Sequence, residues 1–425
     1  MKAGAGKSEI TLTDDYLMVE NFTVIHRALN ARAVVMENKN FFVCLSLEMT
    51  SLPNEEVSMI RREIAERFRL EESQVWVCVT HTFSAPHLLP DEILKDDEKI
   101  KQKGIYRDAI KEAAMCAVGQ AFDTLQPVTT GFGSGLCDVN RNRDVELQDG
   151  WWVGEGSLGL TDHTVSVLRL NREDGTPLAV MFHYGVQSSV LDGSELSAGG
   201  KAVSPDLAGI ASDYIEKNYK EEGTVGLFLV GAAGDQCPTE KTVNEVFVQG
   251  ERVLRDRQEE GFSICERLGE RLGKVVCDVV QAVTCSNAGS EITFGKARFS
   301  VPGKEMERDL KKLHPVKEMV YAPSADKETE VEAVCIGELA MIGVKPELNC
   351  CSGIAIGACS PFRNTLVCTM VNGASKYMAD KGSYDRYTYE AMNSPFGKGA
   401  AELLARQSLT LLETLAGHEN NEDCA

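Results

Sequence analysis

Short apolar runs alternate with amphipathic stretches along the chain, and this pattern predicts an α/β protein. Apolar residues fill 31–36 and 41–47 on either side of the polar segment 37–40, which is typical of two strands joined by a turn. Residues 53–68 begin with Pro-Asn-Glu-Glu and then carry apolar residues three or four positions apart, which predicts a helix. By the same criteria we expect further strands at 75–79, 164–170, 177–183, 225–230, 339–344 and 366–371, and further helices at 106–125, 206–219, 250–283 and 400–415.

The alternation continues without a Pro/Ser-rich linker. We therefore expect one domain over 1–425, with a mixed β-sheet core flanked by helices. The charged segment 304–330 has the weakest pattern and is expected to be a hinge or a surface excursion. The Gly/Ser-rich segment 188–204 is expected to be a loop, where functional residues often lie.

Composition narrows the class of protein. The 425 residues are 43% hydrophobic, which is enough to bury a sizeable core, and 14 scattered cysteines fit reduced, buried thiols better than a disulfide framework. The net charge of −20 is spread along the chain and disfavours binding to nucleic acid or to anionic membranes. The sequence has neither a signal-peptide pattern nor a run that could span a bilayer, so we expect a cytoplasmic protein.

A glycine-rich turn is the strongest local signal for chemistry. Residues 231–238, Gly-Ala-Ala-Gly-Asp-Gln-Cys-Pro, follow the apolar strand 225–230, and open α/β sheets usually keep their sites at the carboxyl ends of strands. Backbone amides in such a turn favour a thiolate at Cys237, as nucleophile or metal ligand. The alternative is a small buried residue in a tight turn.

Three further residues lie just beyond apolar strands, and each has a functional and a structural interpretation. His81 is a candidate metal ligand or a hydrogen-bonded structural histidine. Glu347 could bind a metal, act as a base, or only cap a turn. Tyr377 belongs to the same site or simply packs.

These residues and their neighbours resemble the neutral/alkaline non-lysosomal ceramidases and their shorter bacterial relatives. The resemblance runs over nearly the whole chain. In chain order the segments that carry it are Ala3-Gly4-Ala5-Gly6-Lys7-Ser8-Glu9-Ile10-Thr11, residues 25–33, Val79-Thr80-His81-Thr82-Phe83-Ser84-Ala85-Pro86, Asn140-Arg141-Asn142-Arg143 with 148–150, Gly234-Asp235-Gln236-Cys237-Pro238, Val344-Lys345-Pro346-Glu347 and Asn372-Gly373-Ala374-Ser375-Lys376-Tyr377.

The resemblance implies a zinc amidase that uses two histidines, a glutamate and a tyrosine around one metal ion. The first histidine falls on His81, the glutamate on Glu347 and the tyrosine on Tyr377, but the second histidine position is Gln187. An amide oxygen is a poorer zinc ligand than imidazole, so the site would hold zinc more weakly or prefer a harder ion. His183 is ~13 Å away along an extended strand and cannot replace it; His87 is a substitute if its loop folds back.

Further departures separate the chain from that family. Phe83 stands where the family has another histidine, and Cys237 where it has a serine. The carboxy-terminal immunoglobulin-like domain and the secretion signal of the longer ceramidases have no counterpart in the sequence. The resemblance therefore implies the fold and an altered hydrolase site. It gives the least support for a lipid substrate.

Three hypotheses follow. The leading one is a metal-dependent hydrolase of an amide or related C–N bond in a small soluble substrate, with metal ligands His81, Gln187, Glu347 and Tyr377, catalytic residues Cys237, Asp235 and Arg141, and substrate-binding residues Asn140, Phe83, His87 and Gly234. The second is a metal-independent enzyme that depends on Cys237. The third is a catalytically silent relative that binds a ligand. We expect a small-molecule substrate and no organic cofactor, and a homo-oligomer is compatible with the sequence.

Overall fold

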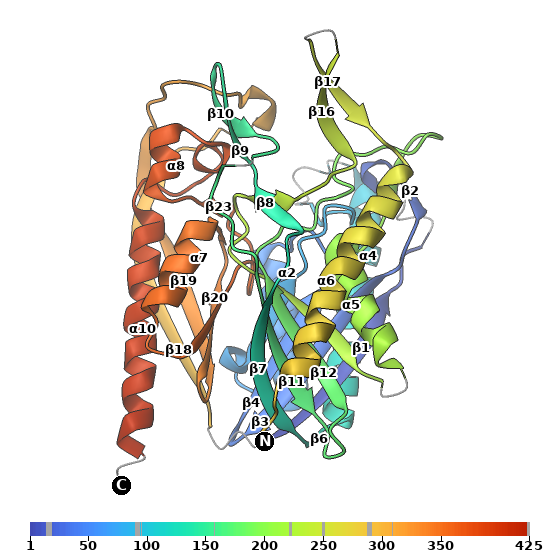
Figure 1. Cartoon of the computed structure of the whole chain (residues 1–425), viewed down its shortest axis with the longest axis vertical. Coiled ribbons are helices and arrows are strands. Elements are labelled where there is room, and N and C mark those ends of the chain that lie inside the picture. Colours follow the sequence, from blue (N-terminus) through green and yellow to red (C-terminus); the bar gives the residue numbers. More distant parts are fainter. Residues whose placement is uncertain are drawn as a thin grey trace.

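Three β-sheets, each covered on its outer face by two helices, make up most of the chain (Figure 1). A computed structural model describes residues 1–13, 19–89, 94, 96–156, 158–220, 223–248, 251–286, 291–307 and 309–422. The fold is therefore mixed α/β, as the alternating pattern predicts. The predicted mixed β-sheet core flanked by helices is confirmed, and it consists of three sheets. The hydrophobic pattern marks buried strands but does not say which strands pair.

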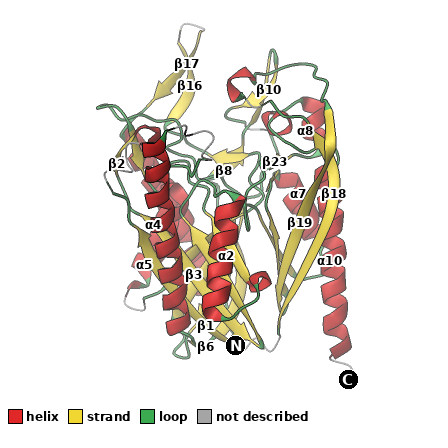
Figure 2. Cartoon of the chain, turned by 180° about the vertical axis from the view of Figure 1, so that it is seen from behind, coloured by secondary structure: helices red, strands yellow, loops and turns green. Residues whose placement is uncertain are grey.

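The first sheet has the strand order β5-β4-β3-β1-β6. Its helices α2 and α4 lie over it when the molecule is seen from behind (Figure 2). The bounds are β1 (Lys2–Ile10), β3 (Leu29–Asn38), β4 (Asn40–Leu47), β5 (Val75–Val79), β6 (Gln126–Pro127), α2 (Asn54–Phe68) and α4 (Asp97–Asp123). The predicted strand pair around 37–40 is confirmed as β3 and β4, which are antiparallel.

The second sheet has the order β14-β12-β11-β7, and the third has the order β18-β19-β20-β22. Helices α5 and α6 pack on the second sheet, and α7 and α10 pack on the third. The bounds in the second unit are β7 (Thr129–Leu136), β11 (Thr164–Asn171), β12 (Pro177–Tyr184), β14 (Val225–Val230), α5 (Asp206–Asn218) and α6 (Glu260–Ala282). Those in the third are β18 (Ile292–Lys304), β19 (Pro323–Ile336), β20 (Leu339–Val344), β22 (Asn364–Cys368), α7 (Cys350–Cys359) and α10 (Ala400–Glu422).

The inner faces of all three sheets meet in one central core. Successive strand residues point to opposite faces, so Val35 packs under α2 and α4 whereas its neighbour Val34 enters the central core. Leu227 from the second sheet and Met341 from the third belong to the same central cluster. Each helix pair closes a separate outer core. Strands β5, β14 and β20 are therefore buried on both faces, which explains their continuous apolar runs in the sequence.

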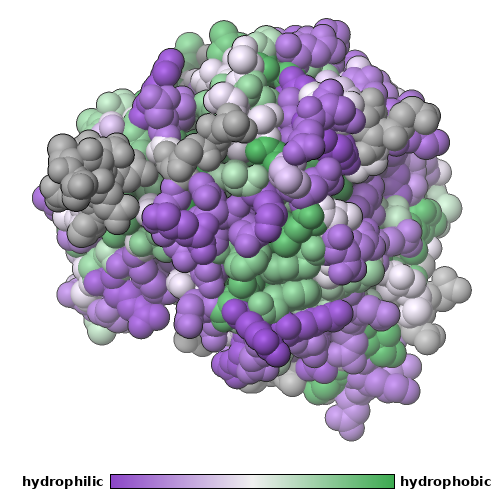
Figure 3. All heavy atoms as spheres, turned by 90° about the horizontal axis from the view of Figure 1, so that it is seen from below, coloured by the Kyte–Doolittle hydropathy of each residue, from purple (hydrophilic) through white to green (hydrophobic). Residues whose placement is uncertain are grey.

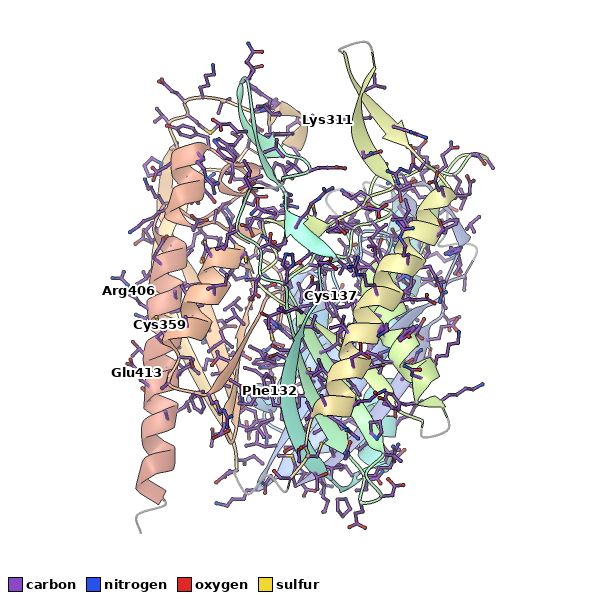
Figure 4. All side chains as sticks on the ribbon, viewed as in Figure 1. Phe132, Cys137, Lys311, Cys359, Arg406 and Glu413 are labelled. Atoms are coloured by element: carbon purple, nitrogen blue, oxygen red, sulfur yellow. The ribbon has the colours of Figure 1, made fainter. Side chains whose placement is uncertain are left out.

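Figure 4 marks the middle and one edge of this arrangement. Phe132 lies on β7 and Cys137 follows just after that strand, whereas Arg406 and Glu413 lie on the exposed side of α10, away from the sheets. At the end of the molecule that carries the termini, hydrophilic groups surround a hydrophobic area (Figure 3). Within the described ranges no helix has the length and apolar character needed to cross a membrane.

Two element predictions are wrong in part. The helix expected at 250–283 begins only at Glu260; residues 251–256 form strand β17 (Glu251–Asp256), paired with β16 (Val243–Val248) in a projecting hairpin, and residue 250 is not described. The segment 304–330 is not a hinge throughout, because from Pro323 it belongs to β19. Its charged side chains occupy the exposed end of a long two-stranded ribbon, which hides the strand pattern.

Each sheet contains one parallel strand pair, namely β4 with β5, β12 with β14, and β20 with β22. The chain leaves these strands at neighbouring carboxyl ends. Besides the β16–β17 hairpin, the described residues form four short two-stranded sheets. These are β8 (Asn140–Asn142) with β15 (Gln236–Pro238), β9 (Asp144–Leu147) with β10 (Gly150–Val153), β21 (Glu347–Leu348) with β23 (Tyr377–Met378), and β2 (Phe22–Ile25) with β13 (Lys201–Val203). In Figure 1, β8 lies above strands β7 and β11 of the second sheet.

Candidate active site

The predicted site residues follow the carboxyl ends of the parallel strands. His81 follows β5, Gln187 follows β12, Cys237 lies in the turn after β14, Glu347 follows β20 and Tyr377 follows β22. The parallel pair β21 and β23 puts Glu347 directly opposite Tyr377. Residues from three sheets therefore converge at one end of the fold, which is where ligands bind in open α/β sheets.

Backbone contacts hold His81 and Gln187 near each other. Thr82 and Ser188 form an isolated parallel bridge, and the Phe83 amide donates to the Ser188 carbonyl at 3.0 Å. His81 has a φ of 59°, a left-handed conformation that side chains other than glycine rarely adopt. Such a conformation persists only where the surrounding structure imposes it, and this is common at functional sites.

His81, Glu347 and Gln187 form a direct hydrogen-bonded chain. The His81 Nδ1 lies 2.7 Å from the Thr50 carbonyl oxygen and its Nε2 lies 3.1 Å from Glu347 Oε2. Burial opposes charge on the imidazole, but the Glu347 carboxylate outweighs it and raises the pKa of His81. Burial also opposes ionisation of Glu347, yet His81 lowers the pKa of this carboxyl. Both ring nitrogens face acceptors, an arrangement that favours the imidazolium form of His81 beside the carboxylate.

Arg143 completes the chain at the other side of Gln187. Its Nη1 donates to Gln187 Oε1 at 2.6 Å, while Gln187 Nε2 donates to Glu347 Oε2 at 2.7 Å. Its Nε donates to Glu390 at 2.8 Å, and its guanidinium carbon lies 5.3 and 5.8 Å from the ring centres of Tyr377 and Tyr389. The side chain is buried, and although burial alone would lower its pKa, Tyr377 and Glu390 raise it. The guanidinium is a fixed cation.

Arg143 was missed in the sequence, where Arg141 was chosen from the same Asn-Arg-Asn-Arg segment. Arg141 instead pairs with Glu155 at 3.1 Å, at the edge of the site. Glu390 and Asp144, also missed, form a carboxyl pair behind Arg143; burial and Glu390 raise the pKa of Asp144 to about 9. Arginines two positions apart in one segment give no sequence signal for which of them is buried.

Cys237 faces the pocket, and β15 pairs it with Arg141 on β8. The side chain is only 4% exposed. Burial raises the pKa of the thiol, although Arg141, Lys241 and Arg143 act in the opposite direction. The thiol is therefore protonated near neutral pH in the free protein.

Three other predicted residues support the backbone of the site. Asp235 accepts from the Cys350 amide at 2.8 Å and from Asn142 at 3.0 Å; burial raises its pKa to about 6 despite these bonds. The Asn140 amide group donates to the carbonyls of Asp162 and Gly185 at 2.9 and 2.7 Å. The Gly234 amide donates to the Leu348 carbonyl at 2.8 Å. None of the three lines the main pocket.

The two predicted substrate contacts from residues 83–87 separate. Phe83 lines the main pocket, with its ring centre 4.8 Å from that of His81. His87 instead lies 3.1 Å from Glu20 in a smaller cavity of about 120 Å³, which Phe83 divides from the main pocket. The loop does not fold back, so His87 does not replace Gln187 beside Glu347.

The main pocket has a volume of about 630 Å³. Arg143, Gln187, Cys237 and Tyr377 contribute to its lining, together with Tyr389. The β9–β10 hairpin and the β16–β17 hairpin supply apolar walls, which include Val145, Leu147, Trp152, Val153, Val243 and Leu254. The charged groups Lys241 and Asp192 are paired with each other at 3.3 Å, and Glu155 with Arg141. A small molecule with both apolar and polar parts fits this lining.

The four predicted metal ligands are close together but, as arranged, do not fit a zinc ion. Zinc needs lone pairs, whereas Gln187 presents N–H to Glu347 and turns its oxygen to Arg143. The Arg143 cation also lies against the Tyr377 ring. Across the described ranges, histidine, cysteine and acidic side chains form no cluster of three or more that could hold a metal ion. The zinc ion expected from the resemblance stays a prediction.

The chain has the fold of two solved ceramidases. A neutral ceramidase from Pseudomonas aeruginosa aligns with a TM-score of 0.73 and 17% identity, over 98% of this chain and 74% of that one. A ceramidase complexed with C2 aligns with a TM-score of 0.75 and 17% identity, over 98% of this chain and 75% of that one. No protein-family model matches the chain, and no curated protein matches it in sequence. The predicted resemblance is confirmed at the level of the fold.

Proposed function

We propose that the chain hydrolyses an amide or related C–N bond of a small substrate bound in the main pocket, with Cys237 as the attacking group. The observation that carries this proposal is the presence of the Cys237 thiol, the Arg143 cation and the Tyr377 hydroxyl in the lining of one pocket. The ceramidase fold supports amide hydrolysis by analogy. The arrangement of Gln187 and Arg143 favours a thiol over a metal-bound water.

In the proposed reaction the Cys237 sulfur attacks the carbonyl carbon and a C–S bond forms. The C–N bond then breaks, and the thiol proton leaves with the amine nitrogen. Water hydrolyses the thioester, which yields the acid and restores the thiol. Burial keeps the Tyr377 hydroxyl protonated by raising its pKa, so this hydroxyl supplies a donor for the carbonyl oxygen beside the Arg143 cation, which Glu390 holds in place.

The test is amine release from a panel of small N-acyl amino acids and N-acyl amines, in the presence of EDTA. Wild type should turn over at least one compound, and Cys237→Ala should lose about 1000-fold or more in kcat/KM. Iodoacetamide should inactivate a variant in which the exposed thiols Cys116 and Cys359 are replaced by serine, with the label on Cys237. Full activity after labelling of Cys237 contradicts the proposal. Activity that EDTA abolishes and zinc restores would instead support the metal-dependent mechanism.

A ligand-binding role without turnover is the second candidate, and one observation favours it. Burial raises the pKa of Cys237, and His81 has both nitrogens engaged, so no free base stands ready to activate the thiol. This candidate predicts that compounds of the same panel raise the thermal unfolding temperature and are recovered unchanged. Release of amine from any of them contradicts it.

A further inference from the structure

We propose that Arg143 takes the place predicted for the metal ion, so that the site is built around a fixed guanidinium and excludes zinc. This proposal does not depend on hydrolysis, because it concerns how the predicted ligands are held. It rests on the contacts of Gln187, Glu347 and Arg143.

The orientation of the Gln187 amide carries the first step. Arg143 Nη1 can only donate, so the amide must turn its oxygen toward it, at 2.6 Å. A carboxylate can only accept, so Glu347 Oε2 must face the amide nitrogen, at 2.7 Å. If the amide were rotated by 180°, its N–H would face the Arg143 N–H and its oxygen would face the Glu347 carboxylate. Neither of these pairs can form a hydrogen bond. The amide therefore has one orientation, and it directs N–H to Glu347, where a metal ligand would direct a lone pair.

The charge of Arg143 carries the second step. Its guanidinium contacts Gln187 directly and lies 5.3 Å from the Tyr377 ring centre, so it touches two of the four predicted ligands. Arginine stays charged when buried, and a divalent cation beside it would be repelled. Glu390 receives Nε at 2.8 Å and lies 2.7 Å from Nη2, which holds the guanidinium in position.

These contacts assign Arg143 the electrostatic role of the ion. A buried cation next to Tyr377 and the pocket can attract a carbonyl or carboxylate oxygen of a ligand, as a metal ion would, without proton or ligand exchange. The nearby position 187 then has no need of a histidine. The substitution of glutamine for the second histidine is thus coupled to Arg143 rather than being a separate loss.

The test is calorimetric titration with zinc chloride of four proteins, each checked by circular dichroism. They are wild type, Gln187→His, Gln187→His with Glu390→Gln, and Gln187→His with Glu390→Gln and Arg143→Met. The last replaces the cation and its partner together, so that no unpaired charge stays buried, and the third is its matched control with Arg143 retained.

We expect no zinc binding by wild type and at least about 100-fold tighter binding by the triple variant than by its control. Stoichiometric zinc binding by wild type overturns the proposal, as does equal affinity of the triple variant and its control. If the triple variant does not fold, the wild type and the control decide: the proposal stands if neither binds zinc and fails if either does. Loss of amide hydrolysis alone does not affect it.

Discussion

At the scale of single residues, the behaviour of the Cys237 thiol follows from its surroundings. Burial raises its pKa above the ordinary value, so only a small fraction is thiolate near neutral pH. If the thiolate attacks the substrate, kcat/KM should rise with pH by about tenfold per unit below the thiol pKa. A pH–rate profile from pH 6 to 9 measures this rise. A flat profile contradicts Cys237 as the attacking group.

Lys304 gives a second prediction, on stability. It is 4% exposed, its Nζ donates to the Met392 carbonyl at 2.9 Å, and burial lowers its pKa from 10.5 to about 8. Between these values the unfolded chain binds more protons than the folded chain, so this residue makes the free energy of unfolding rise with pH. Urea unfolding of wild type and Lys304→Met from pH 7 to 10 should show a steeper rise for wild type. Parallel curves would show that the lysine is not desolvated.

At the scale of elements, the contact of β1 with α4 depends on glycine. A Cβ added at Gly6 would lie 2.2 Å from the Ala117 carbonyl oxygen, whereas one at Gly104, in the same helix as Ala117, meets no heavy atom within 4 Å. Gly6→Ala should lower the free energy of unfolding by about 1–3 kcal/mol because the helix must shift. Gly104→Ala should raise it by about 0.5–1 kcal/mol through helix propensity. Denaturant unfolding checks both, and equal effects would contradict the close packing.

The element scale also shows what the sequence could predict. The strands that end at His81 and Glu347 were predictable, because a strand buried on both faces reads as an unbroken apolar run and then stops. Strand β17 at residues 251–256 was not predictable from the sequence. Its residues Val253 and Leu254 lie in a two-stranded hairpin, but they continue the amphipathic pattern of α6. Arg143 could not be assigned either, because its partners Gln187 and Glu390 are distant in sequence and no periodicity reports them.

At the scale of the whole molecule, a buried ion-pair network joins the first and second sheet units. Arg32 on β3 pairs with Glu48 and reaches α5, where Nε contacts Glu216 at 2.7 Å and Nη2 contacts Asp213 at 2.6 Å. Arg32→Met would leave the buried Glu48 carboxylate without its cation, whereas Lys7 still pairs with Asp213 and Glu216, and the variant should lose about 3–5 kcal/mol in the free energy of unfolding.

An exposed ion pair serves as the control for Arg32. Lys274 and Asp278 pair at 2.8 Å with side chains 65% and 58% exposed, so Lys274→Met should cost about 0.5 kcal/mol or less. Urea unfolding monitored by circular dichroism measures both variants. A loss for Arg32→Met no larger than that for Lys274→Met would show that the network does not join the two units.

The convergence of three sheets at one end explains how the fold shared with ceramidases gathers the predicted site residues. The strands bring positions 81, 187, 347 and 377 together through backbone pairing. Arg143, directly after β8, then contacts Gln187 and lies against the Tyr377 ring. The fold is shared, and a guanidinium is part of the site that it carries here.

The most direct measurement of this central claim is anomalous X-ray scattering at the zinc edge from wild-type crystals grown with zinc chloride. We predict no anomalous peak between His81, Gln187 and Glu347, and density that places Arg143 against Gln187. A zinc peak bonded to His81 and Glu347, with Arg143 displaced from Gln187, would contradict the account.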